Sequence, residues 1–335
     1  AMSLSRERKP GEPVRVGVLA YDGCYAAEIF GLTDLLRIAN LVATGSGQPC
    51  PFAVEVLGAT DTITAAGGFG LAPQRWHRRL DVLVVPGFEL IPGIDVKPLL
   101  AERAAEVGFI RSLGTRGCTV ASVCVGAYLV AAAGLLDGRR ATTSWLFADD
   151  LAACTPTATI TPDAMLVTDG SVTTSAAFSA VHDLAMDLVR RHGGESVARQ
   201  TARITLVPDN RTSQAPYVDR RPANRPGLTD DVTNWLAERL ADPYDLSRLA
   251  AAFHLSTRTL LRRFGAEAGT SPLVRLHDLR VARAQRLLES TDLSSDDVMR
   301  SVGYRDAGSF RRQFVTRVGI TPAAYRRQFQ GIAEN

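Results

Sequence analysis

Residues 249–272 read L-A-A-A-F-H-L-S-T-R-T-L-L-R-R-F-G-A-E-A-G-T-S-P, and residues 299–322 read M-R-S-V-G-Y-R-D-A-G-S-F-R-R-Q-F-V-T-R-V-G-I-T-P. From residue 260 onward the two stretches match at a constant offset; the pairs are Leu260 with Phe310, Arg262 with Arg312, Phe264 with Phe314, Gly269 with Gly319, and Pro272 with Pro322. Each stretch predicts a short apolar helix, a tight break and a second helix with arginines on one face. Such self-similarity indicates one supersecondary unit used twice. We therefore expect two helix-turn-helix units, a motif that reads DNA.

The outer face of each second helix is the part predicted to meet DNA. Leu260 and Phe264 stand four residues apart and are expected to point to the core, as are Phe310 and Phe314. Arginine suits the outer face because its planar guanidinium pairs with both acceptors of guanine. A solvated helix face is the alternative, and the repeated layout favours DNA contact. The candidate DNA-contacting residues are Ser256, Thr257, Arg258, Leu261 and Arg262, then Arg305, Ala307, Gly308, Arg311 and Arg312.

Composition and charge are consistent with a two-domain globular protein. The chain has 335 residues, of which 46% are hydrophobic and 22% charged, so it is too long for one ordinary core and too apolar to be disordered. The formal net charge is +3. From Thr229 onward there are 16 arginines, no lysine and 13 acidic residues, whereas the charges of residues 1–228 cancel. The positive excess therefore lies in the part that carries the repeat, as phosphate binding requires.

The cysteines and the termini indicate a cytoplasmic protein without a metal site. The five cysteines are Cys24, Cys50, Cys118, Cys124 and Cys154, an odd number with no C-x-x-C pair. Neither a disulfide framework nor a zinc site is indicated, and we expect no cofactor. The first ten residues are polar and contain no signal peptide. Residues 118–136 are uncharged, but their glycines and alanines suit a buried strand followed by a buried helix better than a membrane span.

Upstream of the repeat, short β-branched runs alternate with helical patterns. The predicted strands are residues 14–20, 52–58, 81–86 and 119–123, and the predicted helices are residues 26–40, 96–113, 125–135 and 176–191, with a β-rich piece at 158–174. This alternation predicts a doubly wound α/β domain. Residues 208–227 are rich in proline and polar residues, which predicts an exposed linker. The expected boundaries are 12–206 for the α/β domain, 207–228 for the linker and 229–331 for an all-α domain.

Residues 229–331 closely resemble the DNA-binding domain of the AraC family. The strongest part is G-Y-R-D-A-G-S-F-R-R-Q-F-V-T-R-V-G-I-T-P-A-A-Y-R, residues 303–326. The resemblance implies seven helices, with a long helix at residues 273–288 joining two units that read successive major grooves of double-stranded DNA. It also implies transcriptional control by a homodimer, with RNA polymerase as a further partner. Ala307 and Gly308 are small where longer polar residues are common, so the second helix is expected to act more through phosphates than through bases.

Cys124 stands where an apolar strand turns into a helix, in A-S-V-C-V-G. A nucleophile on such a turn is exposed, and the helix amino terminus favours the thiolate. An inert buried cysteine among small apolar residues is an equally good interpretation.

The segments around Cys124 resemble the ThiJ/PfpI family, of the class I glutamine amidotransferase-like fold, over about residues 12–206. The motifs are P-G-F at 86–88, the cysteine turn, A-G-L-L-D-G-R-R-A-T-T-S-W at 133–145 and T-S-A-A-F-S-A-V-H-D-L at 174–184. Glu28 matches the acid that approaches the cysteine in that family. The resemblance implies a flavodoxin-like doubly wound sheet, and an order of domains known from regulators in which a ThiJ/PfpI-like sensor precedes an AraC-type reader.

Two departures from that family decide the expected chemistry. Val125 stands where the hydrolase branch has a histidine, and Ser144 stands where related members have one. Without a base no acyl transfer is expected, so we predict a binding pocket and no enzyme. His77 and His182 are interpreted as structural or solvated. The candidate pocket residues are Glu28, Gly87, Phe88, Cys124, Val125, Ser144 and Trp145.

The sequence therefore predicts a transcriptional regulator that senses a small-molecule effector. A cysteine-dependent hydrolase or hydratase fused to a DNA reader is one alternative. The other is a redox sensor through Cys124, with Cys118 as the candidate resolving cysteine. Similar regulators respond to amino acids, amides and quaternary amines, and Glu28 with Trp145 would suit a cation unless both are packing residues.

Overall fold

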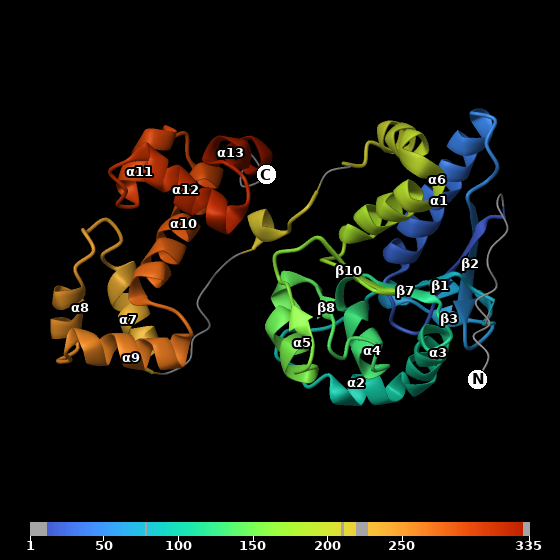
Figure 1. Cartoon of the computed structure of the whole chain (residues 1–335), viewed down its shortest axis with the longest axis horizontal. Coiled ribbons are helices and arrows are strands. Elements are labelled where there is room, and N and C mark those ends of the chain that lie inside the picture. Colours follow the sequence, from blue (N-terminus) through green and yellow to red (C-terminus); the bar gives the residue numbers. More distant parts are fainter. Residues whose placement is uncertain (1–11, 78, 209–210, 219–226, 331–335) are drawn as a thin grey trace. The chain divides into compact units, whose positions relative to one another are not determined.

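The computed structural model describes residues 12–77, 79–208, 211–218 and 227–330. The chain divides into two compact units, Ala1–Gln214 and Ala215–Asn335, each of which is described by itself (Figure 1). The first is an α/β unit and the second is built of helices.

A seven-stranded sheet forms the centre of the first unit. Its strands, in spatial order, are β10 (Leu166–Asp169), β11 (Val172–Ser175), β7 (Thr119–Ser122), β6 (Val82–Val85), β1 (Val14–Leu19), β2 (Phe52–Gly58) and β5 (Gln74–Arg75). All neighbours pair in parallel except β10 with β11, so only this edge is antiparallel. Every residue of β6 is buried, as expected of a strand covered on both faces. The predicted doubly wound α/β fold is confirmed, and the four predicted strands lie within a residue or two of their expected bounds.

Helices cover both faces of this sheet (Figure 1). On one face α1 (Ala26–Gly45) packs beside α6 (Ala180–Thr205). The other face carries α2 (Lys97–Glu102), α3 (Ala104–Gly114), α4 (Ala127–Ala132) and α5 (Ala148–Cys154). Short elements complete the unit: β3 (Ile63–Thr64), η1 (Ala66–Gly68), β4 (Gly70–Leu71), η2 (Cys124–Gly126), β8 (Arg140–Ala141), η3 (Trp145–Phe147) and β9 (Thr159–Ile160).

Two predicted helices differ from the structure. The single helix expected at residues 96–113 is broken at Arg103, whose backbone departs from helical geometry at φ −102° and ψ 26°. The Arg103 guanidinium donates hydrogen bonds to the carbonyls of Leu99 and Asp22 and lies 4.8 Å from the Phe88 ring centre. The helix expected at 176–191 begins at Ala180 and continues to Thr205 across a kink at Gly194, where φ is 85°.

Part of the segment predicted as an exposed linker is buried in the first unit. Gln214 is 2% exposed, and its Nε2 donates hydrogen bonds to the carbonyls of Thr143 (2.8 Å) and Pro162 (2.7 Å). Its Oε1 accepts from the Trp145 N–H at 3.1 Å. Proline and polar composition predicted exposure, but a glutamine amide can satisfy several backbone groups at once, and here it does. The neighbouring residues 209–210 and 219–226 of that segment lie outside the described residues.

The second unit contains seven helices among its described residues, as the AraC resemblance implied. They are α7 (Leu228–Ala237), α8 (Leu246–Ala252), α9 (Thr257–Ala268), α10 (Pro272–Ser290), α11 (Ser295–Ser301), α12 (Ala307–Val318) and α13 (Pro322–Phe329), preceded by η4 (Ala215–Tyr217). Figure 1 shows α10 running between the two helix-turn-helix pairs, α8–α9 and α11–α12. Each pair has its own core: Leu260 and Phe264 belong to one cluster, and Phe310 and Phe314 to the other.

The turns of the two helix-turn-helix units use different residues for one backbone conformation. His254 follows α8 with φ 54°, and Gly303 follows α11 with φ 86°. Only glycine fits the second turn, because a Cβ on Gly303 would stand 2.4 Å from the Leu240 carbonyl oxygen and 2.9 Å from the Ala241 Cα. The second turn is also one residue longer, and Arg305 stands in the added space before the α12 cap, Asp306.

Replacing Gly303 by alanine is expected to lower the free energy of unfolding of the second unit by at least about 2 kcal/mol, because left-handed strain and a backbone clash add. His254→Gly is the matched control, since this turn already holds a side chain, and its effect should stay below about 1 kcal/mol. Urea denaturation of both variants measures the difference. Equal stabilities for the two variants would show that the close approach at Gly303 does not exist.

Candidate DNA interface and candidate ligand site

The outer face of α9 lies in solvent, as the sequence predicted. Arg258 and Arg262 are exposed, and Leu261 retains 40% of its accessible surface, whereas Leu260 and Phe264 are fully buried. Ser256 caps the helix, because its Oγ accepts a hydrogen bond from the Thr259 N–H at 3.2 Å. Thr257 is half-buried. Contact of these residues with DNA stays a prediction.

The α12 helix repeats the layout with a different cap. The Asp306 carboxylate accepts a hydrogen bond from the Ser309 N–H at 2.6 Å, and Ser309 Oγ in turn accepts one from Arg312 Nη2 at 3.0 Å. Arg305, Ala307, Gly308, Arg311 and Arg312 are all exposed. Arg312 is thus partly engaged within its own helix, while Arg311 remains free to reach outward.

Polar side chains of α10 connect the two helix-turn-helix units. Arg280 is 6% exposed, and its guanidinium donates hydrogen bonds of 2.8 Å to the carbonyls of Leu240 and Asp242. The same group lies 5.3 Å from the Tyr304 ring centre in the turn of the second unit. His277 Nδ1 is 2.8 Å from the Tyr304 hydroxyl, and the two rings stack. These contacts hold elements of both units against one helix.

In the first unit Cys124 lies on a strained turn between β7 and α4. Its φ is 52°, a conformation uncommon for a non-glycine residue, and its N–H donates to the Ala176 carbonyl at 2.9 Å. A Cβ on Gly126 would stand 2.5 Å from the Val85 carbonyl oxygen, so only glycine lets the turn approach β6. The predicted turn at the end of the strand is therefore present.

Glu28 and Gly87 converge on Cys124. Glu28 is 1% exposed, and its Oε2 accepts a hydrogen bond from the Gly87 N–H at 2.6 Å. A Cβ on Gly87 would stand 3.3 Å from the Cys124 Cβ and 3.4 Å from both Glu28 oxygens. The Glu28 Oε1 is buried without a hydrogen-bond partner among the described residues. These three residues form the centre of the candidate site.

The centre of this site is uncharged near neutral pH. Burial raises the pKa of Glu28 to about 8, although the Gly87 N–H favours the ionised form. Burial and then the Glu28 charge raise the pKa of Cys124 to about 12, although hydrogen bonds from the backbone of Val125 and Phe178 favour the thiolate. The helix amino terminus was expected to favour the thiolate, and desolvation outweighs it. Glu28 is then a neutral acid with a free hydroxyl, and Cys124 a thiol.

The other predicted site residues are placed differently. Phe88 is buried beneath Arg103 and beside Tyr21, away from solvent. Val125 and Ser144 are buried, and Trp145 is half-buried in the loop that Gln214 holds. Thr143 Oγ1 ties this loop to the elbow by donating to the Cys124 carbonyl at 2.8 Å.

Sequence reasoning did not select Tyr25 and Phe178, which border the same site. The Tyr25 N–H donates to the Gly87 carbonyl at 2.9 Å, and its ring meets Phe178 edge-on at 5.5 Å. Phe178 keeps 47% of its surface exposed. Phe178 lies inside a quoted family motif and Tyr25 directly precedes α1, so position relative to these elements was the available signal.

No base stands at the positions that the family pattern provides. His77 Nε2 is 2.7 Å from Glu55 Oε2, and His182 Nδ1 is 3.3 Å from the Ser179 carbonyl, so both serve as structural residues. The suggestion that Cys118 could resolve an oxidised Cys124 is wrong. The two cysteines flank opposite ends of β7, roughly 20 Å apart along an extended chain, and a disulfide needs Cα atoms within about 7 Å.

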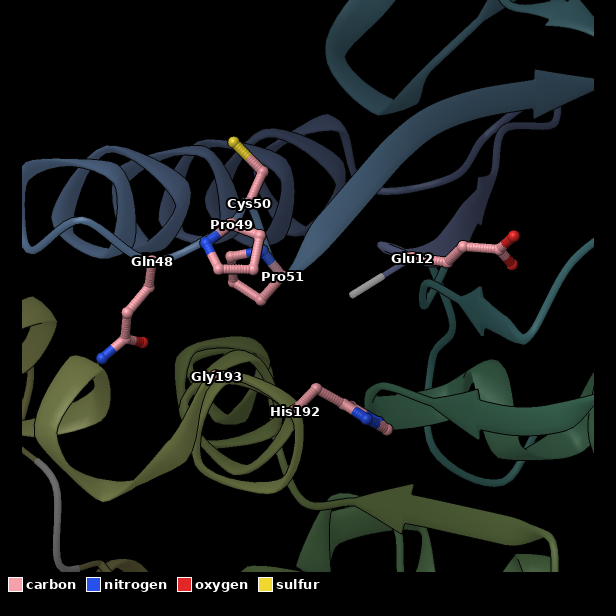
Figure 2. Close-up of a pocket in the computed structure, with 7 residues that line it drawn as sticks. All are labelled: Glu12, Gln48, Pro49, Cys50, Pro51, His192 and Gly193. Atoms are coloured by element: carbon pink, nitrogen blue, oxygen red, sulfur yellow. The ribbon is translucent and has the colours of Figure 1, made fainter. Parts of the chain in front are cut away.

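A cavity of about 330 Å³ lies at the amino-terminal edge of β1 and β2, on the opposite side of the sheet from Cys124. Figure 2 shows its lining, in which the Cys50 thiol and the His192 imidazole point away from one another. The His192 ring instead meets Phe52 edge-on. The cavity lining consists of Glu12, Gln48, Pro49, Cys50, Pro51, His192 and Gly193. It therefore presents no cysteine–histidine pair.

The model of the DJ-1/PfpI family matches residues 15–191, more than half of the chain. The chain belongs to the DJ-1/PfpI family. A second model, that of a helix-turn-helix domain, matches residues 249–328. This DJ-1/PfpI protein therefore carries an AraC-type helix-turn-helix domain after its α/β domain. None of the helices in the described part of the chain has the length and apolar content that a membrane span requires.

Relatives share one or both domains. The HTH-type transcriptional regulator CdhR of Pseudomonas aeruginosa is 29% identical over 249 residues, which cover 73% of this chain and 71% of CdhR. The HTH-type transcriptional regulator GlxA of Rhizobium meliloti is 26% identical over 323 residues, covering 94% of this chain and 96% of GlxA. An isonitrile hydratase of Pseudomonas putida is 31% identical over 195 residues, covering 57% of this chain and 79% of that enzyme.

Glu28→Gln is expected to stabilise the first unit in a pH-dependent manner. The folded state holds the proton up to about pH 8, whereas the unfolded state loses it near pH 4.5, so wild-type stability falls as pH rises between these values. Glutamine mimics the neutral acid and avoids this loss. The gain should be near zero at pH 4, grow to as much as about 4 kcal/mol and level off above pH 8. Calorimetry across this range measures it, with the second unit as internal control; a pH-independent gain would contradict a neutral Glu28.

Proposed function

We propose that this protein is a sequence-specific DNA-binding transcriptional regulator whose first unit senses a small metabolite. It acts as a homodimer on repeated half-sites in double-stranded DNA and controls RNA polymerase there. The observation that carries the proposal is the pair of helix-turn-helix units, each with an exposed arginine-bearing face opposite a buried apolar pair. A single such face could be an ordinary solvated surface, whereas two on one α10 match two successive major grooves.

The two readers are proposed to contribute unequally. Arg262 stands directly opposite Leu260 and Phe264, with Arg258 one turn earlier, so both can reach base edges. In α12, Ala307 and Gly308 offer no long polar group, and Arg312 is engaged with Ser309. The first unit therefore supplies most base recognition and the second mainly phosphate contacts.

Arg262→Ala should weaken binding to an operator selected from random duplexes by roughly 1–3 kcal/mol and relax preference at one base pair. Arg312→Ala should weaken specific and random DNA more evenly. Arg263→Ala is the matched control, because it removes the same charge from the side of α9 and not from its outermost line. Fluorescence anisotropy with specific and scrambled duplexes measures each ratio. An unchanged ratio for Arg262→Ala would refute base reading by this residue.

The proposed effector site lies at Cys124, Glu28 and Gly87, bordered by Tyr25 and Phe178. A neutral Glu28 offers a buried hydroxyl without a partner, and buried donors normally find an acceptor. The effector is therefore proposed to present an acceptor oxygen or nitrogen to Glu28. An ionised Glu28 that attracts a cation fits less well, because desolvation favours the neutral acid. Binding alters the equilibrium between dimer arrangements only through its difference in affinity for them.

Gln214 offers a route by which this site reaches the second unit. Its amide holds the Thr143–Trp145 loop, which Thr143 ties to Cys124, and the next residue along the chain begins the second unit. A change at Cys124 that moves this loop must also move Gln214. The signal therefore follows the covalent chain.

An enzymatic role is the second candidate, because an isonitrile hydratase is among the relatives. Against it stand the raised pKa of Cys124 and the residues Val125 and Ser144, which supply no base. We propose that the fold keeps the site and uses it for binding.

A thermal-shift screen run in parallel on wild type and Cys124→Trp tests the site. Effectors that bind only the folded state raise the melting temperature of wild type, and the bulky indole should abolish that shift. Cys124→Ser should retain the shift and the effector-dependent change in DNA binding. Hits that stabilise the tryptophan variant equally would place the effector elsewhere. Burst release of product from an activated ester or amide, lost in Cys124→Ser, would restore the enzyme.

A further inference from the structure

The outer face of α1 is unusual for a helix on the surface of a domain. Its inner residues pack against the sheet and α6, and its outer line consists of Ala27, Phe30, Asp34, Arg37, Leu41 and Thr44, all of which are exposed. Leu41 keeps 73% and Phe30 48% of the accessible surface. A surface helix ordinarily directs polar residues outward, so large apolar side chains on this line suggest a partner.

The two charges at the centre of this line have no partner in their own chain. Asp34 and Arg37 are exposed, and within the described residues neither makes a hydrogen bond or an ion pair. They stand three positions apart with opposite signs, between the two apolar residues. From Phe30 to Leu41 the line therefore reads apolar, acidic, basic, apolar.

This order is complementary to itself. The midpoint of the line falls between Leu35 and Leu36, and residues at equal distances from it match in chemistry. If two copies of α1 cross antiparallel about a two-fold axis through that midpoint, Phe30 meets Leu41 of the partner subunit and Asp34 meets Arg37 of the partner subunit. A two-fold interface uses one surface on both subunits, so only a self-complementary surface can form it.

We propose that this protein dimerises through the outer face of α1, paired antiparallel with α1 of a second copy. The dimer contains two Phe30–Leu41 contacts and two Asp34–Arg37 ion pairs, one set on each side of the axis. This proposal rests on the dimeric regulator described above and names the surface that joins its subunits. A protein of unrelated sequence would need no such palindrome of charge, and so the second copy is the occupant that the observations favour.

The apolar surface extends beyond α1 toward the candidate ligand site. Phe178, 47% exposed, lies against Tyr25 at the start of α1, and His182 lies close to Gly31 on the same side. This added area matters because a stable interface buries about 800 Å² per partner, more than one helix face offers. Phe178 also contributes a backbone hydrogen bond to the Cys124 sulfur, so the proposed interface borders the residue that holds the site.

Exchange of the two charges provides the test, because both residues are exposed and their replacement leaves the core intact. Asp34→Arg places two arginines opposite two arginines across the axis, and Arg37→Asp places four acids there. Each single variant should weaken dimerisation by about tenfold or more in sedimentation-velocity titrations of the full chain. The double variant Asp34→Arg/Arg37→Asp should dimerise like wild type. An equimolar mixture of the two single variants should form heterodimers with comparable affinity.

Arg116→Asp is the matched control: it makes the same charge change at an exposed position after α3, on the opposite face of the sheet, and should leave dimerisation unchanged. Recovery in the mixture also shows that both single variants are folded. A monomeric wild type, or single variants that dimerise as tightly as wild type, would overturn the proposal. No DNA enters this experiment, so its failure leaves base reading by Arg262 untouched, and a negative Arg262 result leaves the α1 surface untouched.

Discussion

Arg280 lies buried in the middle of α10, where its guanidinium donates to the carbonyls of Leu240 and Asp242 and stacks on Tyr304. A buried guanidinium loses solvation, and its pKa is lowered by that burial, so these contacts must compensate. The two helix-turn-helix units have separate hydrophobic cores, and apolar packing alone does not fix one relative to the other. Arg280, together with the His277–Tyr304 pair, supplies that orientation. The spacing of α9 and α12, on which reading two grooves depends, rests on this network.

The first unit shows how a fold can keep a site and change its chemistry. Gly126 permits the close approach to Val85 that places Cys124 on its turn, and Gly87 leaves room for Glu28 beside it. These steric requirements are those of the family. The electrostatics differ from those of an activated nucleophile, because desolvation leaves an acid and a thiol that are both uncharged. Geometry that elsewhere serves covalent chemistry here supplies hydrogen-bond donors in a small enclosed place.

Sequence reasoning reached what depends on local periodicity. Continuous β-branched runs defined β1, β2, β6 and β7, and the spacing of Leu260 with Phe264 oriented α9, because burial on one face imposes that order directly. It missed what depends on distant partners. The break at Arg103 arises from contacts with Asp22 and Phe88, some 80 and 15 residues away in the chain, and the docking of Gln214 from carbonyls at positions 143 and 162. Pairings of this kind leave no pattern in the neighbouring sequence.

The docking of Gln214 has a consequence for how this chain can be divided. Four consecutive residues, 211–214, belong to the first unit: Arg211 pairs with Asp183, the Thr212 carbonyl accepts from Met165, Ser213 bonds the Asp163 carbonyl, and Gln214 closes over the Thr143–Trp145 loop. A fragment that ends at residue 206 would expose these carbonyls and release the loop beside Cys124. The same boundary applies to any fusion that exchanges one reader for another. A sensor transplanted to a new DNA-binding domain must carry its own glutamine latch.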